Sequence, residues 1–170
     1  FNSMKEFILI LGKRDSGKTT TAWVVYQRLL PYASSSRIFI KGTPVVNRGE
    51  IVYKPVPHDK QPEDFKAILA REDYKIAIIS GGDDPNLLKD EIASVYDEVD
   101  FIVISLRSIK RPGSSQQMIE DNYPKDYTRP FWIERNPSLT HPMDIVNSKR
   151  PLGDRIANYI LVQTTQRPLL

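Results

Sequence analysis

The sequence contains no cysteine and only two histidines among its 170 residues. Without cysteine, neither a disulfide framework nor a thiolate metal site can form. The two histidines, His58 and His141, each lie in a polar stretch that contains proline, whereas a zinc site needs several ligands at a set spacing. We therefore interpret both histidines as loop residues and expect no zinc centre.

Long apolar segments are also missing. No apolar run approaches the roughly 20 residues that a membrane-spanning helix needs, and the first short run leads into a glycine-containing stretch, unlike a secretory signal. We expect a cytoplasmic protein that makes no contact with a membrane. Residues 1–3, before Met4, are interpreted as a remnant of recombinant expression, and residues 4–170 are expected to form a single domain.

The chain has little excess of either charge. Its 24 lysines and arginines and 21 aspartates and glutamates give a net charge of +3, and the positive residues are spread along the chain. This distribution favours anionic ligands only slightly. A nucleotide would satisfy it as well as a nucleic acid, so nucleic acid is not specifically indicated as a partner.

Short apolar runs of strand length alternate with segments of helical periodicity. Such continuous runs are typical of parallel strands buried on both faces. Strands are predicted at residues 7–11, 37–41, 51–53, 75–80, 101–104 and 131–133. Helices are predicted to begin near Gly17, Pro62, Asp84 and Gly153. This order predicts an α/β fold, a three-layer sandwich with a mostly parallel sheet of about five strands flanked by helices.

The helix expected near Pro62 depends on two local patterns. Proline suits the first helical position, and Phe65, Ile68 and Leu69 recur at a spacing that would place them on one face of a helix. We therefore predict an amphipathic helix for this segment.

A glycine-containing motif links the first strand to the first helix. Residues 12–19 read Gly-Lys-Arg-Asp-Ser-Gly-Lys-Thr, which matches the pattern G-x-x-x-x-G-K-[ST]. In this pattern the glycines let consecutive backbone N–H groups converge on an anion, and the helix adds the positive end of its dipole. Lys18 would bring a charge to the β- and γ-phosphates, and the Thr19 hydroxyl would coordinate Mg²⁺.

Residues 7–30 resemble the Walker A strand, loop and helix of the P-loop NTPase superfamily. The resemblance implies binding of Mg-ATP or Mg-GTP, but no single reaction, because this fold hosts many chemistries. The sequence has no N-K-x-D guanine motif, which favours ATP. The positions that the resemblance assigns to the nucleotide are Gly12, Ser16, Gly17, Lys18, Thr19 and Thr20.

Two further positions of the loop are candidates for the nucleotide site. Lys13 stands where the deviant Walker A motif of dimeric partitioning-type ATPases has a lysine that reaches across the dimer, although those proteins have small residues where Arg14 and Asp15 follow here. Asp15 adds a carboxylate to an anion-binding loop. We expect it to point outward unless it contacts the metal or a water.

P-loop enzymes need a carboxylate to hold Mg²⁺ or its waters, normally at the end of a neighbouring strand. The strand at residues 75–80 ends in Ser80 instead. Asp84 precedes a proline at the first helical position, so it is predicted to cap the helix. Asp83 is therefore our candidate for the metal and for catalysis, with a turn decoration as the alternative.

The polar, basic segment at residues 108–127 is too long for a plain connection and is predicted to be a lid or binding loop. The layout from residue 76 to residue 104 resembles nucleoside-monophosphate kinases, which implies an arginine-bearing lid at this place. An arginine over the γ-phosphate would offset charge in phosphoryl transfer. Arg107 and Arg111 are the catalytic candidates, with a solvated basic loop as the alternative.

These features predict a Mg²⁺-dependent protein that binds and hydrolyses a nucleoside triphosphate. One alternative is a phosphotransferase, a kinase for a small molecule or a nucleotide. That reaction needs a second substrate pocket, for which the candidates are Tyr123, Tyr127, Arg129 and Trp132. The other alternative is a nucleotide-dependent switch or assembly module with little chemistry, acting on a protein partner or as a homodimer, which the missing strand-end aspartate favours.

Overall fold

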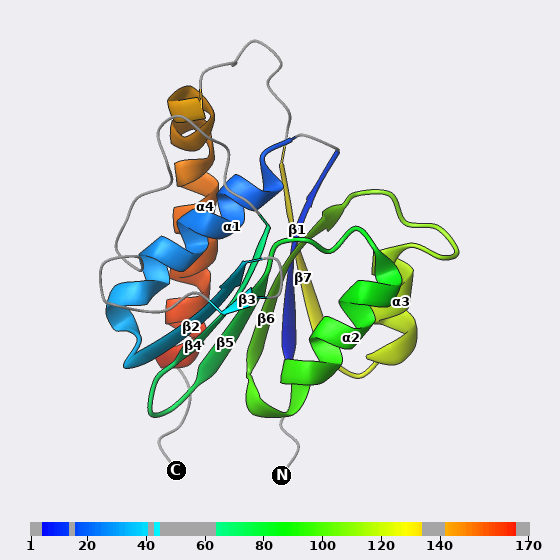
Figure 1. Ribbon diagram of the computed structural model, residues 1–170, viewed down its shortest axis with the longest axis horizontal. Helices are drawn as coiled ribbons and strands as arrows, with labels where there is room; N and C mark the ends of the chain where they lie inside the picture. The colour runs from blue at the N-terminus through cyan, green and yellow to red at the C-terminus, as the bar shows by residue number, and fades with distance from the viewer. Residues whose placement is uncertain (1–4, 14–15, 41–42, 45–63, 134–141, 166–170) are drawn as a thin grey trace.

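The computed structural model describes residues 5–13, 16–40, 43–44, 64–133 and 142–165. The strands form one mixed sheet in the order β3-β2-β4-β5-β6-β1-β7 (Figure 1). Apart from the two-residue β3, six strands remain, and most of their pairings are parallel. The strands are β1 (Glu6–Gly12), β2 (Ser35–Ile40), β3 (Thr43–Pro44), β4 (Phe65–Ala70), β5 (Lys75–Ile79), β6 (Phe101–Arg107) and β7 (Tyr127–Trp132).

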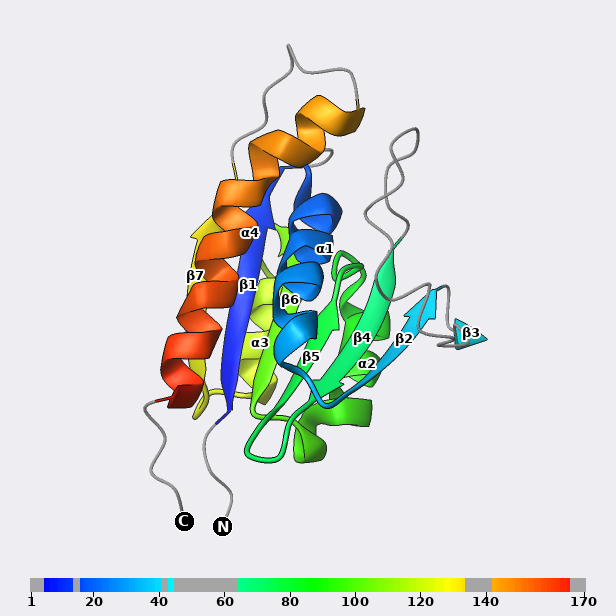
Figure 2. The same cartoon turned by 90° about the vertical axis from the view of Figure 1, so that its left-hand side faces the viewer.

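Helices cover both faces of the sheet. Figure 2 shows α1 and α4 on one face, with α2 and α3 on the other. Alternate side chains of β1 point to opposite faces of the sheet. Ile8 and Ile10 pack with α1 and α4, whereas Leu9 and Leu11 pack with α2 and α3. The α-helices are α1 (Lys18–Leu29), α2 (Pro85–Val95), α3 (Ser115–Asn122) and α4 (Pro142–Thr165), and two 3₁₀ turns, η1 (Leu30–Tyr32) and η2 (Tyr96–Glu98), follow α1 and α2.

The parallel half of the sheet places the glycine motif at a shared edge. β1 is hydrogen-bonded to β6 on one side and to β7 on the other, and β5 pairs with the far side of β6. Because these four strands run in the same direction, their carboxyl ends lie along one edge. Ligands of open α/β sheets bind at that edge.

The predicted helix near Pro62 is wrong, because Phe65, Ile68 and Leu69 belong to strand β4. β4 is antiparallel to both β2 and β5. Helices cover both faces of this part of the sheet, so nearly every β4 side chain is buried or half-buried, and such a run does not alternate as a one-sided strand would. Pro62 itself and the strand expected at residues 51–53 lie outside the described residues, as do His58 and His141.

The segment at residues 108–127 contains more regular structure than a loop. It includes α3, whose N-cap Ser114 accepts a hydrogen bond from the backbone of Gln117, and its last residue begins β7. Ile119 of α3 is fully buried against the sheet. The irregular parts of this segment are therefore residues 108–114 and the short turn at residues 123–126, and a role as a lid stays a prediction.

The C-terminal helix starts earlier than the sequence indicates. It begins at Pro142 and contains Pro151 in its interior. Ile156, Ala157 and Ile160 are buried, as their helical spacing predicts. Within the described ranges, no helix combines the length and apolar character needed to cross a membrane.

Candidate functional site

The glycine motif forms a tight turn between β1 and α1. Gly17 has a left-handed backbone with φ of 92°, a conformation that side chains disfavour. A Cβ atom on Gly12 would lie 2.3 Å from Ser16 Oγ. The path of the loop thus favours glycine at position 17, and a side chain at position 12 would force the Ser16 hydroxyl to move.

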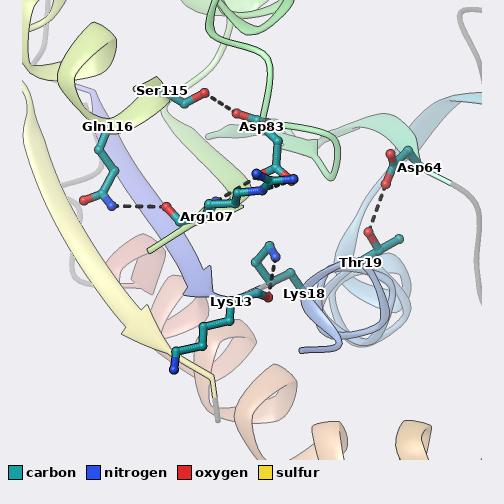
Figure 3. A network of polar contacts seen from close by, with 9 residues as sticks. Lys13, Lys18, Thr19, Asp64, Asp83, Arg107, Ser115 and Gln116 are labelled. Atoms are coloured by element: carbon teal, nitrogen blue, oxygen red, sulfur yellow. Dashed lines mark hydrogen bonds and ion pairs between the residues drawn. The ribbon is translucent and has the colours of Figure 1, made fainter. Parts of the chain in front are cut away.

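The interior of the loop is lined by polar groups. Lys18 is only 9% exposed, and its side chain folds back so that Nζ donates a hydrogen bond to Lys13 O at 2.9 Å (Figure 3). The Lys13 side chain itself is exposed and points away from Lys18. Ser16 Oγ is buried and has no hydrogen-bond partner among the described residues.

A cleft of about 430 Å³ opens beside this loop at the carboxyl edge of the parallel strands. It is bounded by the loop and the start of α1, by the ends of β5 and β6, and by the residue before β4. Its lining residues are Ser16, Gly17, Lys18, Thr19, Thr20, Asp64, Ser80, Gly81, Gly82, Asp83, Asp84, Ser105 and Arg107.

The structure brings two of the predicted catalytic residues, Asp83 and Arg107, into direct contact in this cleft (Figure 3). Asp83 Oδ1 accepts a hydrogen bond from Arg107 N at 2.9 Å, and Asp83 Oδ2 lies 3.4 Å from Arg107 Nε. Helix α3 supports the pair, because Ser115 Oγ donates to Gly82 O and Gln116 Nε2 donates to Arg107 O at 3.2 Å.

Other sequence candidates lie elsewhere. Arg111 does not line the cleft, and its backbone N–H donates to Ser114 Oγ at 3.2 Å. Asp84 caps α2 as predicted, because its carboxylate accepts hydrogen bonds from Asn86 N and Leu87 N. Asp15 lies outside the described residues. None of the residues suggested for a second substrate pocket, Tyr123, Tyr127, Arg129 and Trp132, lines the cleft.

Asp64 is a site residue that the sequence did not reveal. Its Oδ1 atom accepts a hydrogen bond from Thr19 Oγ1 at 2.9 Å and lies 3.5 Å from Ser80 Oγ (Figure 3). The usable signal was its position directly before an apolar run. Interpreting that run as a helix concealed that Asp64 directly precedes strand β4, which pairs with β5.

Lys149 of α4 is a second missed residue. It is only 8% exposed, and a Cβ atom on Gly17 would lie 2.6 Å from Lys149 Cε, so its aliphatic chain packs directly on the loop. Burial lowers the pKa of Lys149 from its ordinary value. Helix α4 therefore brings a second amine close to the loop.

The acids of the cleft do not form a metal centre by themselves. Within the described part of the chain, no group of three histidine, aspartate or glutamate side chains is placed to hold a metal ion. Mg²⁺ commonly takes one or two protein oxygens and fills its other positions with water and phosphate. The Thr19 hydroxyl and the carboxylate of Asp64, which accepts its hydrogen bond, fit that mode of binding.

Fold and site together define an α/β protein with a mixed, mostly parallel sheet and a glycine-containing loop at the carboxyl edge of its parallel strands. Comparisons with protein-family models, with curated proteins and with solved structures found no match to this chain.

Proposed function

We propose that this protein binds and hydrolyses a nucleoside triphosphate, ATP in preference to GTP, in a Mg²⁺-dependent manner as a P-loop protein. One observation carries the proposal: the loop that opens α1 combines a left-handed Gly17, an inward-folded Lys18 and a buried hydroxyl on Ser16 that lacks a partner among the described residues. Such a loop at a helix N-terminus suits a phosphate group, which accepts hydrogen bonds from N–H, O–H and ammonium donors alike.

Each side chain of the loop has a role in this proposal. The Lys18 amine would exchange its contact with Lys13 O for the β- and γ-phosphates. Ser16 would donate its hydroxyl proton to a phosphate oxygen, and Thr20, which lines the cleft one residue further along α1, would contact the α-phosphate. Thr19 would hold Mg²⁺, which neutralises phosphate charge when bound.

Arg107 is placed to act on the far side of the same cleft. It extends from the end of β6, and Asp83 holds it through both its backbone and its side chain. A guanidinium fixed in this way can stabilise the charge that spreads over the γ-phosphate oxygens during hydrolysis. The proposal therefore keeps Arg107 as a catalytic residue and gives no such role to Arg111.

A nucleotide-dependent switch is the second candidate, because Ser80 and not an aspartate follows the last residue of β5, and because the Asp83 carboxylate is engaged by Arg107. With no aspartate at the end of β5 to orient a water, turnover would be slow. Steady-state phosphate release separates the two functions. A hydrolase should turn over repeatedly, whereas a switch should release about one phosphate per protein and then stall.

Thermal unfolding tests the central claim. Mg-ATP at 100 times its Kd should stabilise the folded protein by about 2.7 kcal/mol, because it binds only the native state. The melting temperature should rise accordingly, and Lys18→Ala should remove most of that rise while the protein without nucleotide still unfolds cooperatively. Lys13→Ala is the matched control, because its exposed amine points away from the Lys18 contact and the shift should largely persist. A wild type that no nucleoside triphosphate stabilises at millimolar concentration would refute nucleotide binding.

A further inference from the structure

The direction of β4 places its first residues at the candidate site. β4 runs antiparallel to β5, with Lys66 opposite Ile79, so the start of β4 lies beside the end of β5. Ser80 fixes this junction, because Ser80 N donates to Phe65 O at 3.0 Å and Phe65 N donates to Ser80 Oγ at 2.7 Å. Asp64 stands one residue before Phe65. It therefore occupies the edge where the parallel strand β5 lacks an acid.

Contacts from two segments, the start of α1 and the residues that follow β5, fix the Asp64 carboxylate in the cleft. Thr19 Oγ1 of α1 donates to its Oδ1 atom at 2.9 Å, and Ser80 Oγ lies 3.5 Å from the same oxygen. Gly81 approaches so closely that a Cβ atom there would lie 3.2 Å from Asp64 Oδ2. A threonine hydroxyl that gives its proton to Asp64 keeps its lone pairs for a metal ion.

The Asp83 carboxylate is used differently. Both of its oxygens face Arg107, one at the backbone nitrogen and one at Nε. A metal ion that recruited Asp83 would have to compete with this arginine. Among the described residues, the Asp64 carboxylate has no such cationic partner, and it accepts hydrogen bonds from the hydroxyl groups of Thr19 and Ser80.

We propose that Asp64 supplies the carboxylate for nucleotide-bound Mg²⁺, through the Thr19 hydroxyl and the waters of the metal, and that Asp83 is a positioning residue for Arg107. The acid that β5 lacks at its end is thus provided by the start of its antiparallel neighbour. This inference rests on the proposed nucleotide binding. Ser16, which is 3% exposed and lines the same cleft, has a hydroxyl without a hydrogen-bond partner in the described part of the chain, and this independently indicates a ligand there.

The test measures metal binding directly. Mn²⁺ replaces Mg²⁺, and free Mn²⁺ is followed by electron paramagnetic resonance in the presence of a saturating non-hydrolysable ATP analogue. We expect Asp64→Asn to weaken Mn²⁺ binding at least tenfold relative to wild type, and Asp83→Asn to change it less than twofold. Affinity for the analogue in EDTA should stay within about threefold for Asp64→Asn, because the loop still binds the phosphates.

A double-mutant cycle tests the role given to Asp83. Asp83→Asn and Arg107→Ala should each lower kcat, and the double variant should be no slower than Arg107→Ala alone, because Asp83 acts through Arg107. Equal and independent losses from the two substitutions would show that Asp83 contacts the reacting groups itself. A merely structural role for Asp83 would lower the melting temperature without this non-additivity.

The outcomes separate the two proposals. If Asp64→Asn binds Mn²⁺ as wild type does, or if Asp83→Asn loses the metal instead, the assignment of Asp64 is wrong while nucleotide binding stands. If the wild type binds no analogue in either EDTA or Mg²⁺, the proposed function fails and the inference fails with it. Should Asp64→Asn fold poorly, Thr19→Val provides the second variant, since it removes the hydroxyl that links Asp64 to the metal and should produce the same loss of Mn²⁺.

Discussion

At the scale of single residues, the two left-handed glycines of the described chain have very different surroundings. Gly17 has φ of 92°, and the Lys149 side chain packs against it at the place where a Cβ atom would stand. Gly113, in the connection before α3, has φ of 82° and nothing within 4 Å of the place where a Cβ would stand. The same substitution at both positions therefore separates backbone strain from lost packing.

We expect Gly113→Ala to lower the free energy of unfolding by about 1–2 kcal/mol, which is the cost of a left-handed backbone for a residue with a Cβ atom. Gly17→Ala should cost more than Gly113→Ala, because the new methyl group must also displace Lys149, and it should weaken ATP binding. Urea unfolding of both variants and nucleotide titration of Gly17→Ala measure these effects. If Gly17→Ala and Gly113→Ala lost equal stability, the Lys149 side chain would be able to move aside without a measurable loss of packing energy.

The polar residues that contact one another in the cleft were only partly visible in the sequence. Gly17, Lys18 and Thr19 were found because a local spacing defines their chemistry. Asp64 was missed because it meets Thr19 only through the sheet, 45 positions apart in sequence. Lys149 gave no signal either, since a lysine in an amphipathic helix is usually solvated and its contact with Gly17 depends on how α4 packs.

At the scale of elements, the strands and helices with strong local signals were predicted correctly. β1, β5, β6 and the capped helix α2 all occur where the apolar runs and the Asp84-Pro85 pair place them. The failure at β4 has a physical cause: a strand covered on both faces buries consecutive side chains, and such a run also fits a helical stripe. Local signals could not predict the order of the strands in the sheet, because β6 lies between β5 and β1, and the pairing of β6 with β1 joins residues about 95 positions apart in sequence.

The connection between β6 and α3 is where we expect movement with nucleotide. Residues 108–114 contain Lys110 and Arg111, both exposed, and β6 leads into them from Arg107 in the cleft. Limited trypsin digestion should cleave after Lys110, because the bond after Arg111 precedes Pro112 and resists trypsin. Mg-ATP should slow this cleavage severalfold because a closed segment is less accessible. Cleavage at an equal rate with and without Mg-ATP would argue against a lid.

The same digestion contains its own control. Arg71 is exposed in the turn between β4 and β5, which lies at the opposite edge of the sheet from the cleft. Cleavage after Arg71 should not respond to Mg-ATP. A parallel decrease at Arg71 would show that nucleotide stabilises the whole fold and does not close one segment.

At the scale of the whole molecule, α4 is joined to α1 by an unusually close approach. A Cβ atom on Gly153 would lie 2.4 Å from Val24 Cγ1, so only glycine lets the two helices pack at this distance. We expect Gly153→Ala to destabilise the protein by about 1–3 kcal/mol through overpacking, although alanine normally favours a helix over glycine.

Shortening Val24 should reduce that effect. In a Val24→Ala background the contact with Cγ1 is absent, but Val24 Cβ would still lie 2.6 Å from the new methyl group, so Gly153→Ala should cost less than it does in the wild type without becoming neutral. Chemical denaturation of the two single variants and the double variant completes the cycle. Additive losses would show that the close approach of α1 and α4 does not determine the cost.

The contact between Lys149 and Gly17 also bears on how the protein is made. The loop is synthesised well before the helix that packs on it, because α4 is the last element of the described chain. Both strands that pair with β1, β6 and β7, are also synthesised after it, so neither edge of β1 can be paired earlier. A nascent chain that has exposed only β1 and α1 therefore presents bare aliphatic surface and an unsupported loop. Lys149 of α4 must therefore be synthesised before the loop gains its support, and until β6 and β7 have followed β1, the exposed apolar surface of β1 favours aggregation.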